Sequence, residues 1–486
     1  MNIFETVNIL TAHVCITALT FLIIANIKDL KAYLNKKDIM ILSLFVILGA
    51  YLRYTYTTPA HMIFNDESEY VFAARTIYEK YRLVDYSKSI GWPAFISLFF
   101  TFMPIKLLSV FYINLIIGSL TVIPFYMLLR SFGLSSIQSS FAPFFLVLSP
   151  LHIAWSTAAK NNHLSIFAIL MTLFFAKAFL NKVSIKLFLL VIISTCFSAL
   201  IRPENYILFP VLFLGFWYIF KKRSNHFIKY LPLFLILSLL CVVNLLTVYE
   251  FQTSVNWLET YDDPGFSGAN WSLSNLWNNT FKYIPKILFG KDQPSFIALC
   301  AFLGLPIGLK KYKNLSVYCV TYFLIFSLIY FYSYFQIFGG KDRFYMTFYI
   351  PIFIFASFFF IEIISKLKSK SIFIGLLYPA FALIHYPYIK KMPYFNHESN
   401  ILQSELPQRL TEIVKNHCTV YSLSTLPIKV TTNFKTQYLE NYNPMHNQQN
   451  SCEYFLEDKF CFDWNQDGLS PQCEGFKKKY LLKEVK

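Results

Sequence analysis

Three carboxylates in four residues, Asp66, Glu67 and Glu69, stand out in a chain of 486 residues of which only 14% are charged. They lie between two strongly apolar regions, and placing a carboxylate in hydrocarbon is costly. We therefore expect this loop in water or at a membrane surface. A carboxylate there can take a proton from a reacting hydroxyl, as a general base does. Asp66 and Glu69 also fit a helix-capping pattern, so a purely structural role stays open.

Basic residues that could hold an anionic leaving group come much later, at Arg202, Lys341 and Arg343. The turn from Arg202 to Glu204 interrupts two apolar segments, and its alternative role is a salt-bridged turn with proline at the first helical position. Lys341 and Arg343 lie on the predicted outer side, against the usual excess of basic residues on the cytoplasmic side. We expect them to bind an anion, or else to pair with Asp342 or Glu204.

A third polar group, Lys160, Asn162 and His163, stands at the start of an apolar segment. Helix capping and extension of the lysine toward the interface explain such residues by default. The alternative is a contact with an acceptor substrate, and Glu204 is a candidate for the same contact.

The composition is typical of a polytopic membrane protein. Hydrophobic residues make up 56% of the chain, aromatic residues 19%, and the mean hydropathy is +0.46, unlike a soluble globular protein. A net charge of +16 would suggest nucleic-acid binding in a soluble protein. Here the basic residues collect in short loops on alternate sides of the apolar segments, so we expect no nucleic acid. No cleavable signal peptide is evident.

A spanning helix needs about 20 apolar residues. The sequence predicts an all-α polytopic arrangement of about twelve such helices over residues 1–392. The approximate spans are 7–26, 39–57, 107–129, 137–155, 163–181, 185–201, 205–220, 229–249, 293–309, 315–336, 344–366 and 371–389. The alternation of basic loops predicts a multi-pass protein of a plasma or inner membrane, with both termini and the loops 57–89 and 251–291 extracytoplasmic.

Two short segments should lie against the membrane without crossing it. Residues 69–81 have one apolar stripe at three- and four-residue spacing, which predicts a helix lying along the interface. The apolar segment 91–104 is too short to span and is bounded by Pro93 and Pro104. We expect it to be re-entrant or to lie on the membrane surface.

A small extramembrane domain is predicted over residues 393–486, where the composition changes from apolar to mixed. It contains four of the nine cysteines: Cys418, Cys452, Cys461 and Cys473. An even cluster of this kind predicts two disulfides in an oxidising, external compartment. Their pairing cannot be deduced from the sequence.

Residues 463–474 of this domain fit the twelve-residue calcium-loop pattern. The predicted ligands are Asp463, Asn465, Asp467, the carbonyl of Leu469, and Glu474. Pro471 at position 9 and the lack of clear flanking helices count against this site, and a disulfide at Cys473 would leave an ordinary turn. The prediction is a structural calcium ion in an external compartment.

An active site on the outer face has no access to cytosolic ATP or sugar nucleotides. A transferase there needs an activated donor delivered through the membrane, and a polyprenyl-phosphate sugar meets that need. Phosphate leaves without a proton, so a minimal site needs one carboxylate for the proton of the acceptor and cations for the phosphate. Asp66 and the set of Arg202, Lys341 and Arg343 could supply these two halves.

The order of these features resembles that of the GT-C glycosyltransferases, in particular the branch with protein O-mannosyltransferases and aminoarabinose transferases. The matching residues are Asp66-Glu67, Tyr70 with Ala73-Ala74-Arg75, Gly91-Trp92-Pro93, Arg202-Pro203-Glu204, and Arg343-Phe344-Tyr345 with Pro351. The resemblance covers about residues 40–365. It implies an inverting transferase with Asp66 as the base and Glu67 as a supporting carboxylate or ligand of a divalent metal. Many relatives carry an acidic residue where this chain has Asn162-His163, which leaves the matching metal or acceptor contact open.

Other functions stay open beside this one. Charged turns between spans also occur in transporters and lipid flippases, although no inverted repeat is evident and the charges collect at one face. A glycan polymerase or ligase that uses a diphosphate-linked lipid is a further alternative. The Trp-Trp-Asp-Tyr-Gly type of motif of oligosaccharyltransferases is absent, which disfavours transfer of a whole glycan to asparagine. A lipid, a glycan and a protein all remain candidates for the acceptor.

Overall fold

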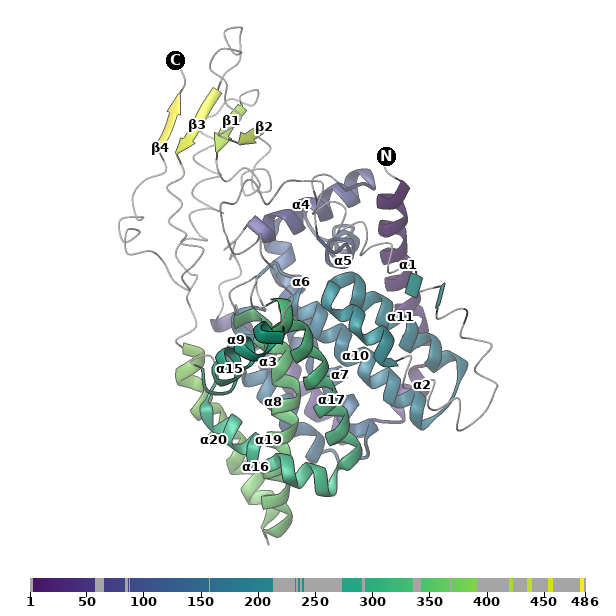
Figure 1. The fold of residues 1–486 in the computed structure, drawn as a ribbon, viewed down its shortest axis with the longest axis vertical. Coiled ribbons are helices and arrows are strands. Elements are labelled where there is room, and N and C mark those ends of the chain that lie inside the picture. Colours follow the sequence, from purple (N-terminus) through teal and green to yellow (C-terminus); the bar gives the residue numbers. More distant parts are fainter. Residues whose placement is uncertain are drawn as a thin grey trace.

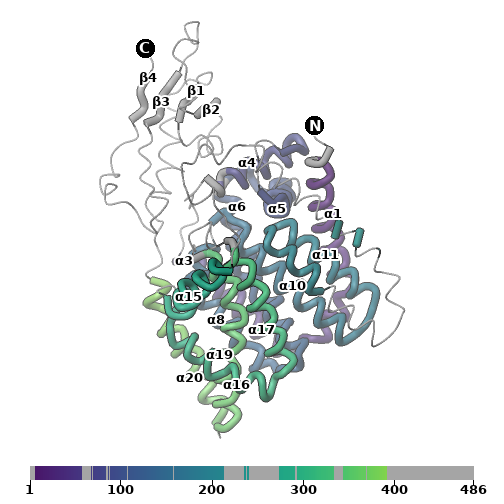
Figure 2. The backbone as a smooth tube through the Cα atoms, viewed as in Figure 1, coloured from purple at the N-terminus to yellow at the C-terminus, as the bar shows by residue number. Residues whose placement is uncertain are grey.

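The structure is a computed structural model that describes most of the first 390 residues and four strands of the tail. The described ranges are 3–56, 65–83, 86, 88–156, 158–212, 273–290, 293–334, 342–367 and 369–390, with single positions between 232 and 239 and strands at 419–422, 435–438, 453–457 and 481–484. The helices form one bundle (Figure 1). In Figure 2, α11 lies beside α1, and the later helices α16 and α20 lie on the other side of the bundle.

Seven helical segments in the described part of the chain are long and apolar enough to cross a membrane. They are formed by α1 (Ile3–Ala25), α3 (Lys36–Tyr56), α6 with α7 (Leu107–Leu120, Val122–Ser131), α10 (Asn162–Asn181), α17 (Lys313–Ile329), α19 (Met346–Lys366) and α20 (Lys370–Lys390). Each coincides closely with one of the predicted spans. Their exposed side chains are large and apolar, such as Phe21 and Ile372, as expected of a lipid-facing surface.

The remaining predicted spans are shorter, interrupted or only partly described, so twelve continuous spans are not confirmed. Residues 137–155 contain η1 (Gln138–Ser140), α8 (Phe141–Leu148) and α9 (Pro150–Ala154). The helix breaks at Ser149, whose ψ of 114° is extended, because a residue before proline avoids the helical region. Helices α11 (Ile185–Ile201) and α16 (Ser295–Lys311) have 17 residues each. Predicted span 205–220 is described only to residue 212, and 229–249 lies almost wholly outside the described residues.

Two short helices, α4 (Asn65–Lys80) and α5 (Gly91–Phe99), lie together at one end of the bundle, across the ends of longer helices (Figure 1). The predicted interfacial helix corresponds to α4, which begins four residues earlier than its apolar stripe indicated. Helix α5 has nine residues and is about 14 Å long, so it cannot cross a hydrocarbon core of about 30 Å. It packs against α4, α1 and α11 instead.

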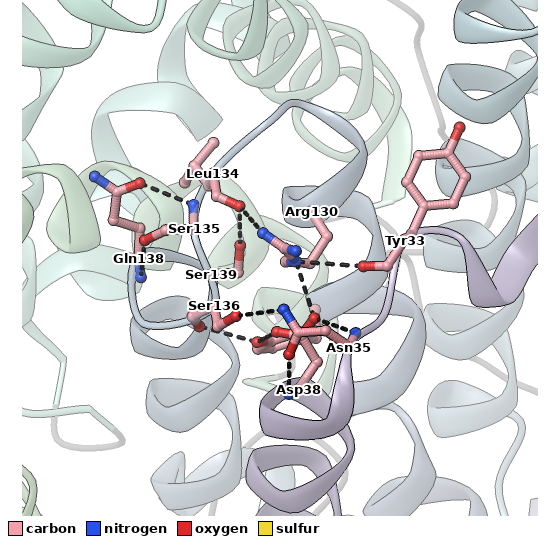
Figure 3. Close-up of polar contacts among 10 residues, drawn as sticks. Tyr33, Asn35, Asp38, Arg130, Leu134, Ser135, Ser136, Gln138 and Ser139 are labelled. Atoms are coloured by element: carbon pink, nitrogen blue, oxygen red, sulfur yellow. Dashed lines mark hydrogen bonds and ion pairs between the residues drawn. The ribbon is translucent and has the colours of Figure 1, made fainter.

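The opposite end of α3 is held by a buried polar cluster around Asp38 (Figure 3). Asn35 and Asp38 cap each other's backbone N–H groups at 3.0 and 2.8 Å. The Tyr126 hydroxyl donates to Asp38 at 2.5 Å, and Arg130 Nε lies 3.4 Å from the same carboxylate. A buried carboxylate needs such partners. The cluster joins the start of α3 to the end of α7, and the short helix α2 (Ile27–Lys31) precedes it.

The tail contains a four-stranded sheet that the sequence did not predict, so the all-α prediction applies only to the membrane part. Its strands are β1 (Thr419–Ser422), β2 (Lys435–Tyr438), β3 (Glu453–Glu457) and β4 (Leu481–Glu484), in the order β2-β1-β3-β4. Strand β1 is parallel to β2 and β3, and β4 is antiparallel to β3. The four cysteines and the proposed calcium loop, 463–474, lie outside the described residues. The disulfides and the calcium ion therefore stay predictions.

Candidate active site

Seven charged side chains are buried in the described part of the chain, and six of them belong to one end of the bundle. The seven are Asp38, Arg53, Glu67, Glu69, Lys160, Arg202 and Glu204. Asp38 belongs to the cluster of Figure 3, at the start of α3. The other six come from the last turn of α3, from α4, and from the turns beside α10 and α11. A gathering of ionisable groups at one end of a membrane bundle indicates a functional site.

The acidic residues occupy the first turns of α4. Glu67 is completely buried and Glu69 is 7% exposed. Lys88 forms an ion pair with Glu69 and its ammonium group lies 5.1 Å from the centre of the Tyr70 ring, so Glu69 has a structural role. Asp66 lies in the first turn of the helix, where the helix dipole favours a negative charge, although only its backbone is described.

Helix α5 holds two other parts of the site together. The Trp92 indole donates to the carbonyl of Ala159 at 3.0 Å. Gly91 lies so close to the end of α11 that a Cβ atom there would be 2.7 Å from the backbone of Leu200 and Ile201. The Gly91-Trp92 pair thus brings the turn before α10 close to the turn that begins at Arg202.

The turn before α10, residues 155–161, is here called the Lys160 turn; Thr157 within it is not described. The Asn114 amide donates to the carbonyls of Ala158 and Lys160, and Asn161 donates to the Ile201 carbonyl at 2.9 Å. Lys160 itself is 2% exposed, with its ammonium group 5.5 Å from the Trp155 ring. Lys160 is therefore buried in the protein. The default explanation from the sequence, that this lysine extends toward the membrane interface, is wrong.

Asn162 and His163 begin α10 and are also buried. The His163 Nε2 atom donates to the carbonyl of His152 at 2.9 Å. At least one ring nitrogen of His163 is thus used within the protein, and the predicted contact of these residues with an acceptor stays a prediction.

The Arg202 turn continues into η2 (Pro203–Ile207), with proline at its first position as predicted. Arg202 forms an ion pair with Glu204, which is the salt-bridged turn that the sequence left open. The Tyr330 hydroxyl donates to the same Glu204 oxygen at 2.8 Å. Tyr330 begins η4 (Tyr330–Tyr334), and α15 (Leu273–Phe289) packs on η4, where Asn279 donates to the Phe331 carbonyl at 2.7 Å.

The structure brings together two of the three predicted phosphate-binding cations. Both contact the ring of Phe344, which belongs to η5 (Asp342–Tyr345). The guanidinium carbons of Arg202 and Arg343 are 5.1 and 5.0 Å from the centre of this ring. Two guanidinium groups that contact one ring put two positive charges in the same part of the structure. Lys341 lies outside the described residues.

Sequence reasoning did not identify Arg53, Asn114, His152 or Tyr330 as parts of this region. It also did not predict that Arg202 and Arg343 contact the same ring, that of Phe344. Arg53 had a usable signal, because an arginine inside a predicted span is a functional candidate by default. Tyr330 and Asn114 had none, since tyrosine and asparagine in an apolar helix do not reveal which distant group they contact.

Among the described residues, no group of three His, Cys, Asp or Glu side chains is arranged to hold a metal ion. The divalent metal implied by the resemblance stays a prediction.

The bundle shares its fold with two solved membrane transferases, as the resemblance seen in the sequence implied. One is ArnT, an aminoarabinose transferase from Cupriavidus metallidurans solved with undecaprenyl phosphate. Its TM-score is 0.55 at 12% identity, over 86% of this chain and 93% of ArnT.

The second is the oligosaccharyltransferase of Archaeoglobus fulgidus, solved with zinc and sulfate. Its TM-score is 0.52 at 14% identity, over 83% of this chain and 62% of that protein. Its apo form gives a TM-score of 0.52 at 11% identity. No protein-family model and no curated protein matches this chain. The fold and the seven apolar helices of the described residues mark an integral membrane protein.

Proposed function

We propose that this protein is an integral membrane glycosyltransferase that transfers a sugar from a polyprenyl-phosphate donor to an acceptor on the extracytoplasmic face. The observation that carries the proposal is the placement of Arg202 and Arg343 on one phenylalanine ring, at the bundle end where α4 carries the acidic residues. The fold supports it, because ArnT has a similar fold and was solved with undecaprenyl phosphate. The acceptor is a lipid, a glycan or a protein.

The proposed reaction is one inverting displacement. The carboxylate of Asp66 takes the proton of an acceptor hydroxyl while its oxygen attacks the anomeric carbon from the side opposite the phosphate. The bond from the anomeric carbon to the phosphate oxygen breaks, and the bonding electrons stay on that oxygen. Polyprenyl phosphate leaves without needing a proton. Glu67 supports the base, as the resemblance implies.

The arginines stabilise the charge that develops on the departing phosphate. Charge-assisted Arg–phosphate hydrogen bonds are short and often bidentate, and donors already in place cost no reorganisation during the reaction. A guanidinium has five N–H donors, so Arg202 can bind phosphate while it remains paired with Glu204. That pair and the Tyr330 hydroxyl hold the guanidinium in one orientation.

Asp66→Asn tests the assignment of the base. Helix α4 begins at Asn65, so Asp66 lies within its first turn and is not the cap that its spacing to Glu69 suggested. Asn is close to Asp in size and its side-chain oxygen can also accept from the free N–H groups of a first turn, so the variant should fold normally. Loss of a general base should slow transfer by about 10²–10⁴-fold, measured as release of polyprenyl phosphate from the sugar lipid in membranes. Glu79→Gln is the matched control, since Glu79 lies on the same helix in a half-exposed pair with Arg75. A normally folded Asp66→Asn protein with wild-type transfer would leave Asp66 with a structural role only.

A further inference from the structure

A wholly buried cluster of Arg53, His152 and His163 lies beside the proposed site and takes no part in the proposed chemistry. None of the three side chains is exposed. Arg53 Nη1 donates to the carbonyl of Gly49 at 2.8 Å, and Nη2 donates to His152 Nδ1 at 2.5 Å. The two imidazole rings meet edge to face, with their centres 4.4 Å apart.

The hydrogen bonds determine where the protons of the two histidines lie. A guanidinium only donates, so His152 Nδ1 must accept and its proton is on Nε2. A carbonyl only accepts, so His163 Nε2 carries the proton in its bond to the His152 carbonyl. His152 is therefore neutral while it is bonded to Arg53. The cluster is a directed series of contacts from α3 to α9 to α10.

The cluster lies next to the Lys160 turn on the same face of α6. A Cβ atom on Gly118 would be 3.1 Å from Arg53 Nε, 3.1 Å from a carbon of the His163 ring and 3.0 Å from Ser156. Gly118 is one helical turn beyond Asn114, so the two positions share a face of α6. Asn114 holds the Ala158 and Lys160 carbonyls. Arg53 and the Lys160 turn are thus packed on consecutive turns of one helix.

We propose that Arg53 is a positioning residue for the phosphate site. His152 precedes the Lys160 turn and His163 follows it. Arg53 contacts His152 directly, and His152 accepts a hydrogen bond from His163 through its carbonyl. Arg53 therefore acts on both ends of the turn. The Lys160 turn also contacts the residue before Arg202, because Asn161 donates a hydrogen bond to the carbonyl of Ile201. Arg53 therefore orients a phosphate-binding arginine that it does not contact. The planar guanidinium suits this task, because it meets two acceptors at fixed angles and lysine does not.

This inference rests on the proposed function. Of the two measurements that test it, hydrogen exchange does not depend on that function. Hydrogen exchange measures the order of the Lys160 turn, and binding of undecaprenyl phosphate measures the phosphate site, both on the purified full-length protein. Arg53→Met should raise exchange in peptides covering 155–163 by about tenfold and weaken lipid binding by about tenfold, as expected from loss of a charge-assisted hydrogen bond. Arg53→Lys should restore only part of both.

Arg130→Met is the matched control, because it removes an arginine from the cluster at the other end of α3. It should loosen residues 33–38 and leave residues 155–163 and lipid binding unchanged. Gly118→Ala is a second variant that keeps every polar group and pushes a methyl group against Arg53 and His163. It should give the Arg53→Met pattern to a smaller degree, and it carries the test if Arg53→Met does not fold.

The outcomes separate this inference from the proposed function. Wild-type exchange at 155–163 in both Arg53→Met and Gly118→Ala would overturn the positioning role. The same loss of binding in Arg130→Met would overturn it as well, because the effect would then be general. A wild-type protein that does not bind undecaprenyl phosphate would overturn the phosphate site, while exchange at 155–163 would still decide whether Arg53 orders the turn.

Discussion

At the scale of single residues, the candidate site depends on side chains that hold the arginines in place. Sequence reasoning found Arg202 and Arg343 because both depart from a rule: one interrupts an apolar region and the other puts a cation on the predicted outer side. It could not place them on Phe344, because a shared ring contact depends on the packing of η2 against η5. It also left two roles open for Arg202, and the ion pair with Glu204 shows that the structural one is present.

Tyr330→Phe tests whether Glu204 must be held for Arg202 to bind phosphate. The change removes one hydroxyl that donates to a buried carboxylate at 2.8 Å. A hydrogen bond to a charged group contributes about 1.5–3 kcal/mol, so undecaprenyl phosphate should bind about tenfold more weakly. Tyr322→Phe is the control, since Tyr322 is also buried, on α17, and its hydroxyl has no hydrogen-bond partner in the described part of the chain. Equal affinity of both variants would contradict the account.

Arg343→Lys tests the predicted phosphate contact. Lysine keeps the positive charge but loses the planar fork that binds phosphate in a bidentate manner and stacks on Phe344. The donor concentration needed for half-maximal transfer should rise by about tenfold. Arg75→Lys on the half-exposed surface of α4 should change nothing. An unchanged dependence on donor concentration would remove Arg343 from the site.

At the scale of elements, apolar length predicted seven of the helices to within a few residues, because a membrane-spanning helix must be about 20 residues long. It failed where proline interrupts the segment 137–155, although Pro150 was visible in the sequence. The short helix α5 was correctly kept out of the spans. Helix α5 joins the Lys160 turn to the Arg202 turn through contacts between residues 67 and about 110 positions apart, which no local pattern reveals.

Gly304→Ala tests the close contact between α16 and α19. A Cβ atom on Gly304 would lie 1.8 Å from the Phe355 carbonyl oxygen, so the helices must move apart. Overpacking usually costs about 1–3 kcal/mol, and thermal unfolding in detergent should shift several degrees lower. Gly375→Ala in α20 has nothing within 4 Å of the added methyl group, and it should unfold at or slightly above the wild-type temperature. Equal unfolding temperatures for the two variants would show that α16 and α19 can separate to admit the methyl group without loss of stability.

At the scale of the whole molecule, the sequence predicted an integral membrane bundle and its sidedness, and only the first is established by the fold. The prediction of sidedness places the Asp38 cluster in the cytoplasm and the candidate site outside. The sheet of the tail was missed because its strands have only four or five residues each, too few for a periodic pattern to stand out.

Labelling of introduced cysteines in intact cells tests the sidedness. With the native cysteines replaced, Ser267→Cys in the long loop should react with an impermeant reagent from outside. Ser135→Cys, at the end of the bundle that contains Asp38, should react only after the membrane is opened. The opposite pattern would show that the protein is inserted in the opposite orientation. The candidate site would then face the cytoplasm, where a donor delivered through the membrane is not needed.

The most direct test of the central claim is to identify the lipid released when the protein acts. Membranes containing the wild-type protein, incubated with a sugar-lipid extract, should accumulate polyprenyl monophosphate by mass spectrometry, and membranes with Asp66→Asn should not. Release of polyprenyl diphosphate would instead indicate a polymerase or ligase. Movement of intact sugar lipid across the membrane with no release would indicate a flippase, and either result would contradict transfer from a polyprenyl-phosphate sugar.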